Sequence, residues 1–503
     1  MQVHSRYCQA CIVHVFKCRR EKITANFMAH NMADAAKTEP PYTIFTHGRR
    51  LLLLVLLSLV GFWSAISNSI YYPALPVISQ EFHETSEMVN LSLVAYLLCQ
   101  GIAPTFTSNF ADSFGRRPTI VACFLVYIGA CVGLSQARAY WVFLLLRCVQ
   151  AGGIAPVIAI NAGISGDVCT PADRGGFVGI VTGTLLVGQA FGSLLGSAIL
   201  SRWSWPAIFA FLAIGSGATL VLLLFSLTET CRAIVGNGSV WPGLVHRAPV
   251  LYLPSFRRHM NHATHTKTAH RPVELAAPFL VFSSFRSSAA LVTAGVQFSA
   301  WTMSLTTLST ELETRFGYSK LHTGLMYLPQ GLCCLVASFG TGQALNVYYK
   351  FRKSRAGDGG FDRVRARLDC SVLPLVFSVV GLLLFGWALQ SARNVASAVV
   401  GTCFLSLGSA CIIAIVTTMM VDLRPENGSA ATSAVNLVRC SMAAVGVAVL
   451  DYMVRRMGVG GCYSFMAGLC VASAMLLVFA VYRHNREERV KDRLDNEGSM
   501  AME

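Results

Sequence analysis

Two arginines lie inside long apolar runs of this 503-residue chain, where charged side chains are rare. Arg147 lies roughly seven residues into its run, about 10 Å deep if the run is a helix that rises 1.5 Å per residue. At that depth in lipid an arginine costs about 2.5–3.5 kcal/mol or more, unless it faces protein or water. We therefore expect Arg147, its neighbour Gln150 and Arg439 to couple charge movement within the membrane. The alternative is that Arg147 extends toward the outer headgroups.

A loop with the sequence ADSFGRRP brings an acid and two bases together around a glycine. Gly115 can open a short turn because it has no Cβ atom. Asp112, Arg116 and Arg117 could then form charge-assisted hydrogen bonds across the seam between helical bundles. We expect this loop to gate movement between the bundles. The alternative is an ordinary basic turn without such a role.

Three glycines recur every four residues in the run VGQAFGSLLGS, namely Gly188, Gly192 and Gly196. On a helix this spacing makes a smooth stripe against which a second helix can pack closely. We expect a packing role for the stripe. A functional bias toward one transport direction is a separate possibility, which the spacing alone does not decide.

Polar and aromatic side chains within the apolar runs are candidates for lining a cavity. Ligand sites are mostly apolar, with a few polar groups in fixed positions. Each such residue could instead form a helix–helix hydrogen bond or anchor a helix at the interface. The expected cavity residues are Asn68, Tyr71, Asn161, Gln189, Gln297, Trp301, Gln330 and Asn436.

The composition indicates the medium in which these residues act. The chain is 54% hydrophobic and 13% charged, with a mean hydropathy of +0.54. Soluble domains carry about a quarter charged residues, so this chain cannot cover a globular surface of its size and lipid is the expected solvent. Most cysteines lie in apolar runs as small hydrophobes, and no CxxC pair is matched by a second one. We therefore expect no metal site.

The apolar runs predict an all-α polytopic membrane protein, because a span needs roughly 20 apolar residues. Twelve transmembrane helices are expected, arranged as two pseudo-symmetric six-helix bundles. The predicted spans are 51–72, 88–108, 118–136, 140–165, 176–200, 205–226, 287–309, 321–345, 371–390, 395–421, 430–454 and 461–482.

The basic residues then predict the orientation. With these spans, 31 of the 40 lysines and arginines fall on the side of the termini and 7 in the opposite loops. Positively charged residues stay in the cytosol, so we expect a multi-pass protein of the cell membrane with both termini cytoplasmic. The net charge of +15 is thus a signal of topology, and no nucleic-acid partner is expected.

The longest polar insert divides the chain into two halves. We expect a disordered cytoplasmic tail over 1–50, bundles over 51–226 and 287–482, a cytoplasmic central loop over 227–286 and a tail over 483–503. A weak repeat supports the division, since DVCTPADRGG follows the fourth span and DLRPENGSA follows the tenth. Two halves related in this way are a common plan of transporters, with the substrate held between them.

Several of these strings resemble the signatures of a known family. ADSFGRRP and RCVQAGG match the loop signature and the buried-arginine motif of the major facilitator superfamily, and VGQAFGSLLGS resembles its antiporter motif. The strings TETCRAIVGNGS, TGLMYLPQG and SAVNLVRC narrow the resemblance to fungal twelve-spanner drug:proton antiporters, near the quinidine-resistance and dityrosine-transporter branch. The resemblance covers residues 50–482. It implies proton-driven export of small organic molecules across a plasma membrane.

The chain also departs from the family pattern. Ser193 stands where the antiporter motif usually has proline, Ser113 replaces a basic residue, and Asn346 replaces an aspartate. Thr228 replaces the proline before Glu229. These differences are compatible with a specialised carrier or with a copy that has lost activity.

We expect a secondary transporter that exports a small amphipathic compound by alternating access, driven by the proton gradient and without a cofactor. Substrate, protons and lipid are the expected partners, and the protein is expected to be a monomer. No Asp or Glu lies near the middle of a predicted span, so the coupling group stays open between the loop around Asp112 and Arg147. A non-transporting receptor or scaffold of the same fold is the alternative. An enzyme is not expected, because no cluster of acids or histidines lies at membrane depth.

Overall fold

The computed structural model describes residues 43–169, 174–238, 240–252, 282, 284–356, 367–391, 394–423 and 428–500. Within these ranges the chain is helical and has no strand. Most of the expected tail over 1–50 and the larger part of the expected loop over 227–286 lie outside the described residues. So does Pro425 of the second repeat string.

The N-terminal half contains eight helices and one 3₁₀ turn in the described ranges. Pro156 begins α7 directly after α6, and because proline lacks an N–H group it breaks the regular hydrogen bonding between these two segments of one span. In the same way η1 and α3 continue the path of α2. The elements are α2 (His47–Ser69), η1 (Tyr72–Ala74), α3 (Leu75–Phe82), α4 (Ser86–Phe114), α5 (Arg116–Ser135), α6 (Tyr140–Ile154), α7 (Pro156–Val168), α8 (Arg174–Arg202) and α9 (Pro206–Ser226).

In the described ranges, the C-terminal half is built from five long helices. The longest, α17, has non-helical backbone at Gly458, with φ 72° and ψ 169°, and reverses there to make two passes. Glycine adopts this positive φ without the steric cost of a Cβ atom. The helices are α12 (Phe285–Thr314), α13 (Lys320–Ala356), α15 (Val372–Ser391), α16 (Val395–Leu423) and α17 (Gly428–Met500).

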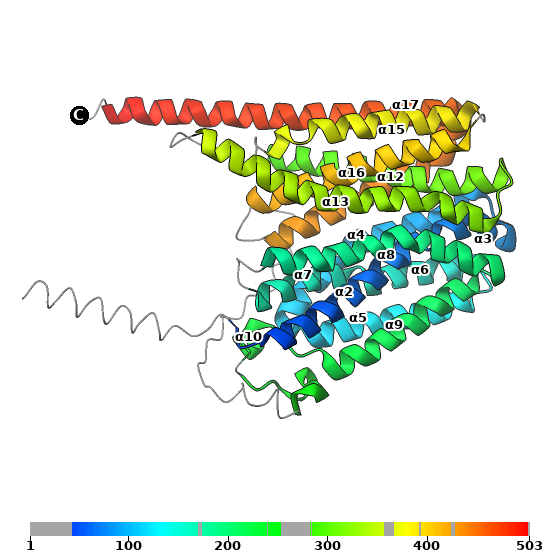
Figure 1. Ribbon diagram of the computed structural model, residues 1–503, viewed down its shortest axis with the longest axis horizontal. Helices are drawn as coiled ribbons and strands as arrows, with labels where there is room; N and C mark the ends of the chain where they lie inside the picture. Colours follow the sequence, from blue (N-terminus) through cyan, green and yellow to red (C-terminus); the bar gives the residue numbers. More distant parts are fainter. Residues whose placement is uncertain are drawn as a thin grey trace, which may run out of the picture.

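The helices run side by side along the long axis of the molecule (Figure 1). The first described helix begins, and α17 ends, at the same end of the bundle. We call this end the terminal face and the opposite end the distal face. The last helix continues to Met500, well past the predicted end of the twelfth span.

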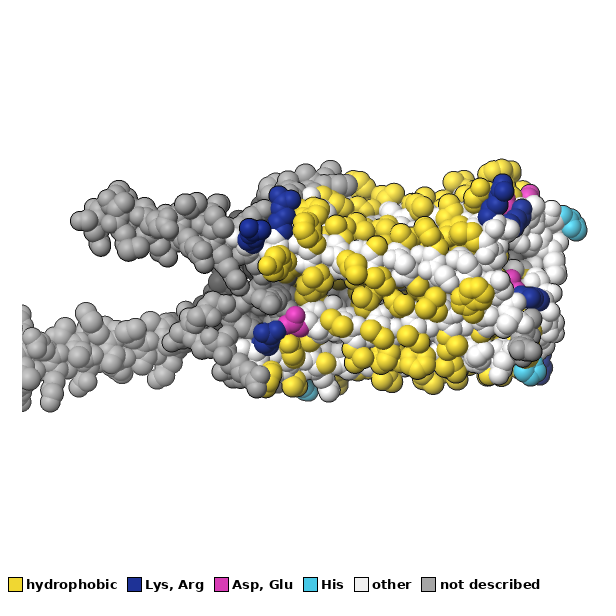
Figure 2. Space-filling view, turned by 90° about the horizontal axis from the view of Figure 1, so that it is seen from above, with side chains coloured by type: hydrophobic (Ala, Val, Ile, Leu, Met, Phe, Trp, Pro, Cys, Tyr) yellow, Lys and Arg dark blue, Asp and Glu magenta, His cyan; other side chains and the backbone are white. Residues whose placement is uncertain are grey.

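Exposed apolar side chains lie between the two ends of the bundle. Figure 2 shows hydrophobic side chains along the middle of one face, with lysines and arginines near both ends. Large apolar side chains such as Ile214, Val336 and Met475 are strongly exposed in this region. Apolar surface of this extent is typical of contact with lipid.

Nine of the described segments are long and apolar enough to cross a membrane. One of them spans Thr432–Arg483 and contains both passes of α17. The helices α8 and α12 lie in the same bundle but are not among the nine, so their membrane crossing stays a prediction. In α12 the threonines donate to carbonyls one turn back, as Thr302 does to Phe298 O at 2.8 Å. These bonds let a helix that is poor in apolar residues lie buried at the centre.

The two halves meet along two helix pairs, α4 with α17 and α8 with α13. Small residues allow both approaches. A Cβ atom on Gly331 would lie 2.5 Å from the Cα atom of Ala190, and one on Gly101 would lie 3.2 Å from Leu437 O. The polar residues that could serve transport lie on and around these two seams.

Candidate functional site

The ADSFGRRP loop joins the end of α4 to the start of α5 at the terminal face. Gly115 has φ +106°, and a Cβ atom there would lie 2.6 Å from Glu229 Oε2. Both the positive φ and the close approach therefore require glycine at this position. The expectation that Gly115 opens the turn agrees with this geometry.

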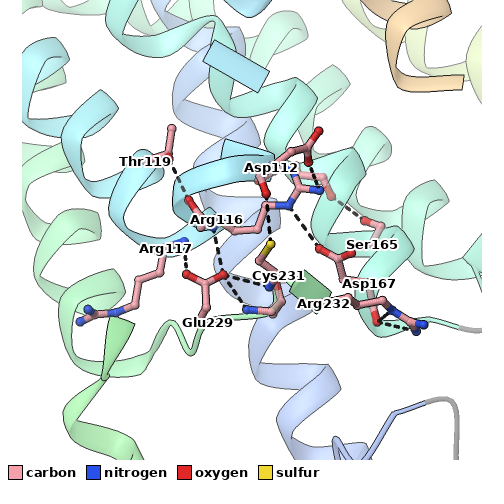
Figure 3. Close-up of polar contacts among 12 residues, drawn as sticks. Asp112, Arg116, Arg117, Thr119, Ser165, Asp167, Glu229, Cys231 and Arg232 are labelled. Carbon is pink, nitrogen blue, oxygen red and sulfur yellow. Dashed lines mark hydrogen bonds and ion pairs between the residues drawn. The ribbon is translucent and has the colours of Figure 1, made fainter. Parts of the chain in front are cut away.

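Arg116 lies between two carboxylates (Figure 3). Its Nη2 atom is 2.5 Å from Asp112 Oδ1, and its Nε atom is 3.2 Å from Asp167 Oδ2. Because Asp167 belongs to α7, both partners are in the N-terminal half. The expectation that this loop pairs across the seam is thus wrong for the described residues. The charges instead hold the ends of α4, α5 and α7 together.

Arg117 points away from this cluster (Figure 3) and binds the last turn of α9 and the chain that follows it. It donates to Leu224 O at 2.8 Å and to Val245 O at 2.9 Å. We call residues 227–252 the strap, of which the structure describes all but 239. The strap includes α10 (Arg232–Val235), η2 (Leu244–His246) and η3 (Pro249–Tyr252), and it contacts α5 and α9.

Glu229 attaches the strap to the signature loop. Its carboxylate is buried and accepts four backbone N–H bonds, from Arg116, Arg117, Thr230 and Cys231, at 2.9–3.2 Å. A carboxylate at the first turn of a helix satisfies free N–H groups and interacts favourably with the helix dipole. Sequence reasoning gave Glu229 no role. An isolated acid soon after the last apolar residue of a span is the signal that could have identified it.

Two neighbours of Glu229 reinforce this attachment. Burial raises the pKa of the Cys231 thiol, which stays protonated and donates to Asp112 O at 3.4 Å. Arg232 donates to Asp167 O from two of its nitrogen atoms. The strap therefore contacts the ends of α4, α5 and α7, which are the helices that Arg116 also joins.

Arg147 is completely buried inside the N-terminal half. Its Nη1 atom donates to Gln150 Oε1 at 2.6 Å, so these two residues share a helix face. Its Cζ atom lies 3.9 Å from the ring centre of Tyr71 and 4.3 Å from that of Tyr96. Arg147 thus faces protein, and the alternative in which it extends to the headgroups is wrong.

Arg439 occupies a related position on the other side of a seam. Its Nη2 atom donates to Asn436 Oδ1 at 2.8 Å, and its Cζ atom lies 4.8 Å from the ring centre of Phe298. Asn436 in turn donates across the seam to Gln100 O at 2.9 Å. Each half therefore holds one guanidinium next to an amide and an aromatic ring.

The glycine stripe of α8 packs against α2. A Cβ atom on Gly188 would lie 2.8 Å from Phe62 O, and Cβ atoms on Gly192 and Gly196 would overlap Ser69 and Ile70. Ser193, which replaces the family's usual proline, donates to Ser69 O at 2.9 Å. The geometry supports the packing role of the stripe.

A small cavity lies between the halves. It is lined by Ser69 and Tyr72, by Gln189, Ala190 and Ser193 of α8, by Trp301 and Leu305 of α12, and by Tyr327, Gln330, Gly331 and Cys334 of α13. Three expected residues, Gln189, Trp301 and Gln330, are among them. Sequence reasoning missed the serines and Tyr327, because small polar residues in apolar runs gave no distinct signal.

Five other expected cavity residues do not line this cavity, because they have other roles or positions. Tyr71 packs on Arg147 and Asn436 bonds across a seam, as described above. Asn161 donates to Leu57 O at 3.0 Å, and Gln297 accepts from Ser409 at 3.1 Å. Asn68 is buried, and its Oδ1 atom has no hydrogen-bond partner. For Asn161, Gln297 and Asn436, the helix–helix alternative is the correct one.

Polar contacts also join the halves at the distal face. Glu87 Oε1 lies 2.9 Å from Arg455 Nη2, and Asn90 donates to Asp451 Oδ2 at 3.1 Å. We call these two contacts the distal lock. Both connect α4 to α17. In this structure the halves are thus fastened together at the distal face.

Comparison with known proteins identifies the group to which this architecture belongs. The Major Facilitator Superfamily matches residues 57–357. A protein of Candida albicans called MFS antiporter QDR2 is 46% identical over 90% of this chain and 92% of its own length. Quinidine resistance protein 1 of Saccharomyces cerevisiae is 38% identical over 87% of this chain and 84% of its own length.

A solved structure supports the fold. The Escherichia coli xylose transporter XylE, in a partially occluded inward-open conformation, superposes with a TM-score of 0.63 over 86% of this chain and 97% of its own. At 11% sequence identity this similarity concerns the fold alone. The chain therefore belongs to the Major Facilitator Superfamily, within its group of fungal quinidine-resistance antiporters.

Proposed function

We propose that this protein exports small amphipathic organic compounds and couples their export to proton entry. The observation that carries the proposal is the cavity between the halves, to which α2 and η1, α8, α12 and α13 all contribute polar side chains. A site built from both halves can be exposed first to one side and then to the other when the halves rock. The antiporter names of the relatives support the same function.

The contacts suggest how the halves move. Because the strap and the Arg116 cluster bind α4, α5 and α7 to one another, the N-terminal half moves as a unit. The distal lock holds the halves together at one end. Exposure of the cavity to the distal side requires that the lock opens.

The energy comes from the proton gradient in this proposal, with no cofactor. The groups that could couple proton movement to export are the Asp112–Arg116–Asp167 cluster and the buried Arg147. The carrier is a monomer of the cell membrane, and its terminal face is in the cytosol, because most lysines and arginines of the sequence fall on the side of the termini in the predicted topology.

Reconstitution in proteoliposomes tests the proposal. Quinidine, the compound in the name of one relative, is a suitable first substrate. We expect quinidine flux that follows an imposed pH gradient and stops when a protonophore removes the gradient. A matched control uses protein-free liposomes of the same composition, because quinidine also crosses lipid unaided.

The rival function is a non-transporting receptor or scaffold. The altered signature residues Ser113, Thr228 and Asn346 are its only support, and the antiporter names of the relatives do not favour it. Purified protein that binds substrates but shows no gradient-dependent flux for any tested compound would support the rival and refute export.

A further inference from the structure

Glu313 is a partly buried carboxylate at the distal end of α12. It lies beyond the predicted span 287–309, close to the distal face. Among the residues that the structure describes, Glu313 has neither a hydrogen bond nor an ion pair, whereas its neighbour Glu311 pairs with Arg315 at 3.6 Å. An ionised carboxylate that is partly removed from water and has no partner is energetically unfavourable.

The part of α12 that carries Glu313 continues directly from the cavity between the halves. Leu305 lines the cavity, and Ser309, one turn further along, donates across the seam to Tyr72 O at 2.8 Å. Glu313 follows Ser309 by another turn. Because residues four apart are neighbours on a helix surface, the carboxylate lies just distal to this contact between the halves.

Glu313 also acts on a residue of the cavity, Tyr327. The Tyr327 hydroxyl donates to Leu305 O at 2.6 Å, and it lies within electrostatic reach of the Glu313 charge. Burial raises the pKa of the Glu313 carboxyl, and the positive charge of Lys320 partly offsets this rise. A carboxyl group with a raised pKa takes up a proton at a less acidic pH than an ordinary glutamate does.

Other titratable side chains on α12 and on the elements packed against it have partners elsewhere or are exposed. They are Glu311 and Arg315 of α12, Glu81 of α3, His322 of α13, and Asp451, Arg455 and Tyr463 of α17. Among the charged groups of the described ranges, Lys320 of α13 is the one that acts on Glu313. The protonation of Glu313 is therefore governed mainly by its access to water.

We propose that Glu313 is the site at which the carrier takes up protons from the distal side. In this structure the halves are fastened together at the distal face, and opening of the seam there would expose the carboxylate to water. The protonated form therefore favours the closed arrangement, and the ionised form favours the open one. A carrier that has released its compound to the distal side closes again when Glu313 binds a proton. The inference rests on the proposed export function and adds a distal site of proton uptake to the coupling groups named there.

Flux of quinidine in proteoliposomes tests the role of Glu313. Two quantities are compared, namely accumulation driven by an imposed pH gradient, and exchange of labelled for unlabelled quinidine at equal pH and concentration. The side chain in Glu313→Gln is always neutral, so the empty carrier closes without a proton. We expect gradient-driven accumulation to fall by about tenfold or more, whereas exchange stays within about twofold of wild type.

Glu311→Gln is the matched control. It removes an acid at the same helix end that already pairs with Arg315, and both quantities should stay within about twofold of wild type. Glu313→Asp keeps a carboxylate and should retain part of the gradient-driven accumulation. Melting temperatures identify any variant that fails to fold.

A second measurement applies to the wild-type protein as well. The distance between spin labels at the distal ends of the two halves is measured in nanodiscs from about pH 5.5 to about pH 8. For wild type we expect a larger closed population at the acidic end of this range. For Glu313→Gln we expect a closed population that does not change with pH.

Three outcomes would overturn the inference. They are normal gradient-driven accumulation by Glu313→Gln, an equal loss in Glu311→Gln, and a distal distance in wild type that does not respond to pH. Failure of the export proposal gives a different result. Wild-type protein without gradient-driven flux of any compound would refute export, while the pH response of the distal distance would still decide whether Glu313 is the proton site.

Discussion

At the terminal face, the carboxylate of a single residue, Glu229, binds the signature loop between two helices. Glu229 accepts N–H bonds from both arginines of the signature loop, although it lies more than a hundred residues later in the chain. Hydrogen bonds to a charged group contribute about 1.5–3 kcal/mol each in favourable cases. Glu229 is therefore as important to this loop as the signature residues themselves.

The first prediction concerns this carboxylate. In Glu229→Gln an amide NH₂ group replaces one of the two carboxylate oxygens. This group is a hydrogen-bond donor and faces backbone N–H groups that are also donors, so the hydrogen bonds to that oxygen are lost. We expect stability to fall by about 1.5–3 kcal/mol and transport to fall severalfold, measured by thermal unfolding and flux. Glu81→Gln, which changes an exposed acid, is the control and should behave as wild type. Unchanged stability of Glu229→Gln would contradict its capping role.

At the scale of elements, glycines form the close contacts at the seams and along the stripe of α8. A Cβ atom added at these positions would collide with a neighbouring helix. The stripe on α8 needs glycine because α2 lies directly against it. Other glycines of the bundle face open space, as Gly217 on α9 does. The same substitution should therefore have opposite consequences at the two places.

The second prediction uses this contrast. Gly192→Ala places a methyl group on Ser69 and should separate α2 from α8, with a cost of about 1–3 kcal/mol. Gly217→Ala adds a methyl group where no atom lies within 4 Å and should be neutral. Melting temperature and the yield of monodisperse protein measure both effects. Equal stability of the two variants would mean that the stripe is not a tight contact.

The third prediction concerns the distal lock between α4 and α17. Its ion pair is exposed and is worth about 0.2–1 kcal/mol, so its loss shifts an equilibrium between closed and open states only severalfold. We expect Glu87→Arg to increase the open population at the distal face, measured as the distance between spin labels on the two halves. The double variant with Arg455→Glu should restore the distribution. If neither variant alters the distribution of distances between the spin labels, the lock has no role in holding the halves together.

At the scale of the whole molecule, transport requires the halves to move while each half keeps its internal contacts. All partners of Arg116 described above lie in one half, so the signature cluster acts by stiffening that half. Arg147 lies within the same half, whereas the cavity and the distal lock join the two. Rigidity is thus a property of one bundle, whereas the cavity and alternation are properties of the pair.

The fourth prediction belongs to this scale. Asp112→Asn removes a charge that neutralises Arg116 at the end of α4. We expect turnover to decrease several-fold while the apparent affinity for substrate stays unchanged, because Asp112 is remote from the cavity. Initial rates of flux over a range of substrate concentrations separate the two quantities. A variant with weaker binding and normal turnover would refute the stiffening role.

Much of the fold follows from the sequence. The runs of apolar residues predicted the positions of the helices, because a helix in lipid must satisfy its backbone hydrogen bonds within its own segment. The glycine stripe and the pairing of Arg147 with Gln150 could also be predicted from the sequence, because residues one turn apart on a helix share a face. The family was recognised from short strings in their order.

The sequence alone did not determine which polar residues meet. Gln189, Trp301 and Gln330 line the cavity, whereas Asn161 and Gln297 bond neighbouring helices, and nothing in the composition of their spans separates the two groups. The capping of the signature loop by Glu229 joins positions far apart in the chain. Local pattern determines helices because their hydrogen bonds are local. Contacts between helices depend on how each helix is rotated and placed against the others, and only the tertiary structure decides that.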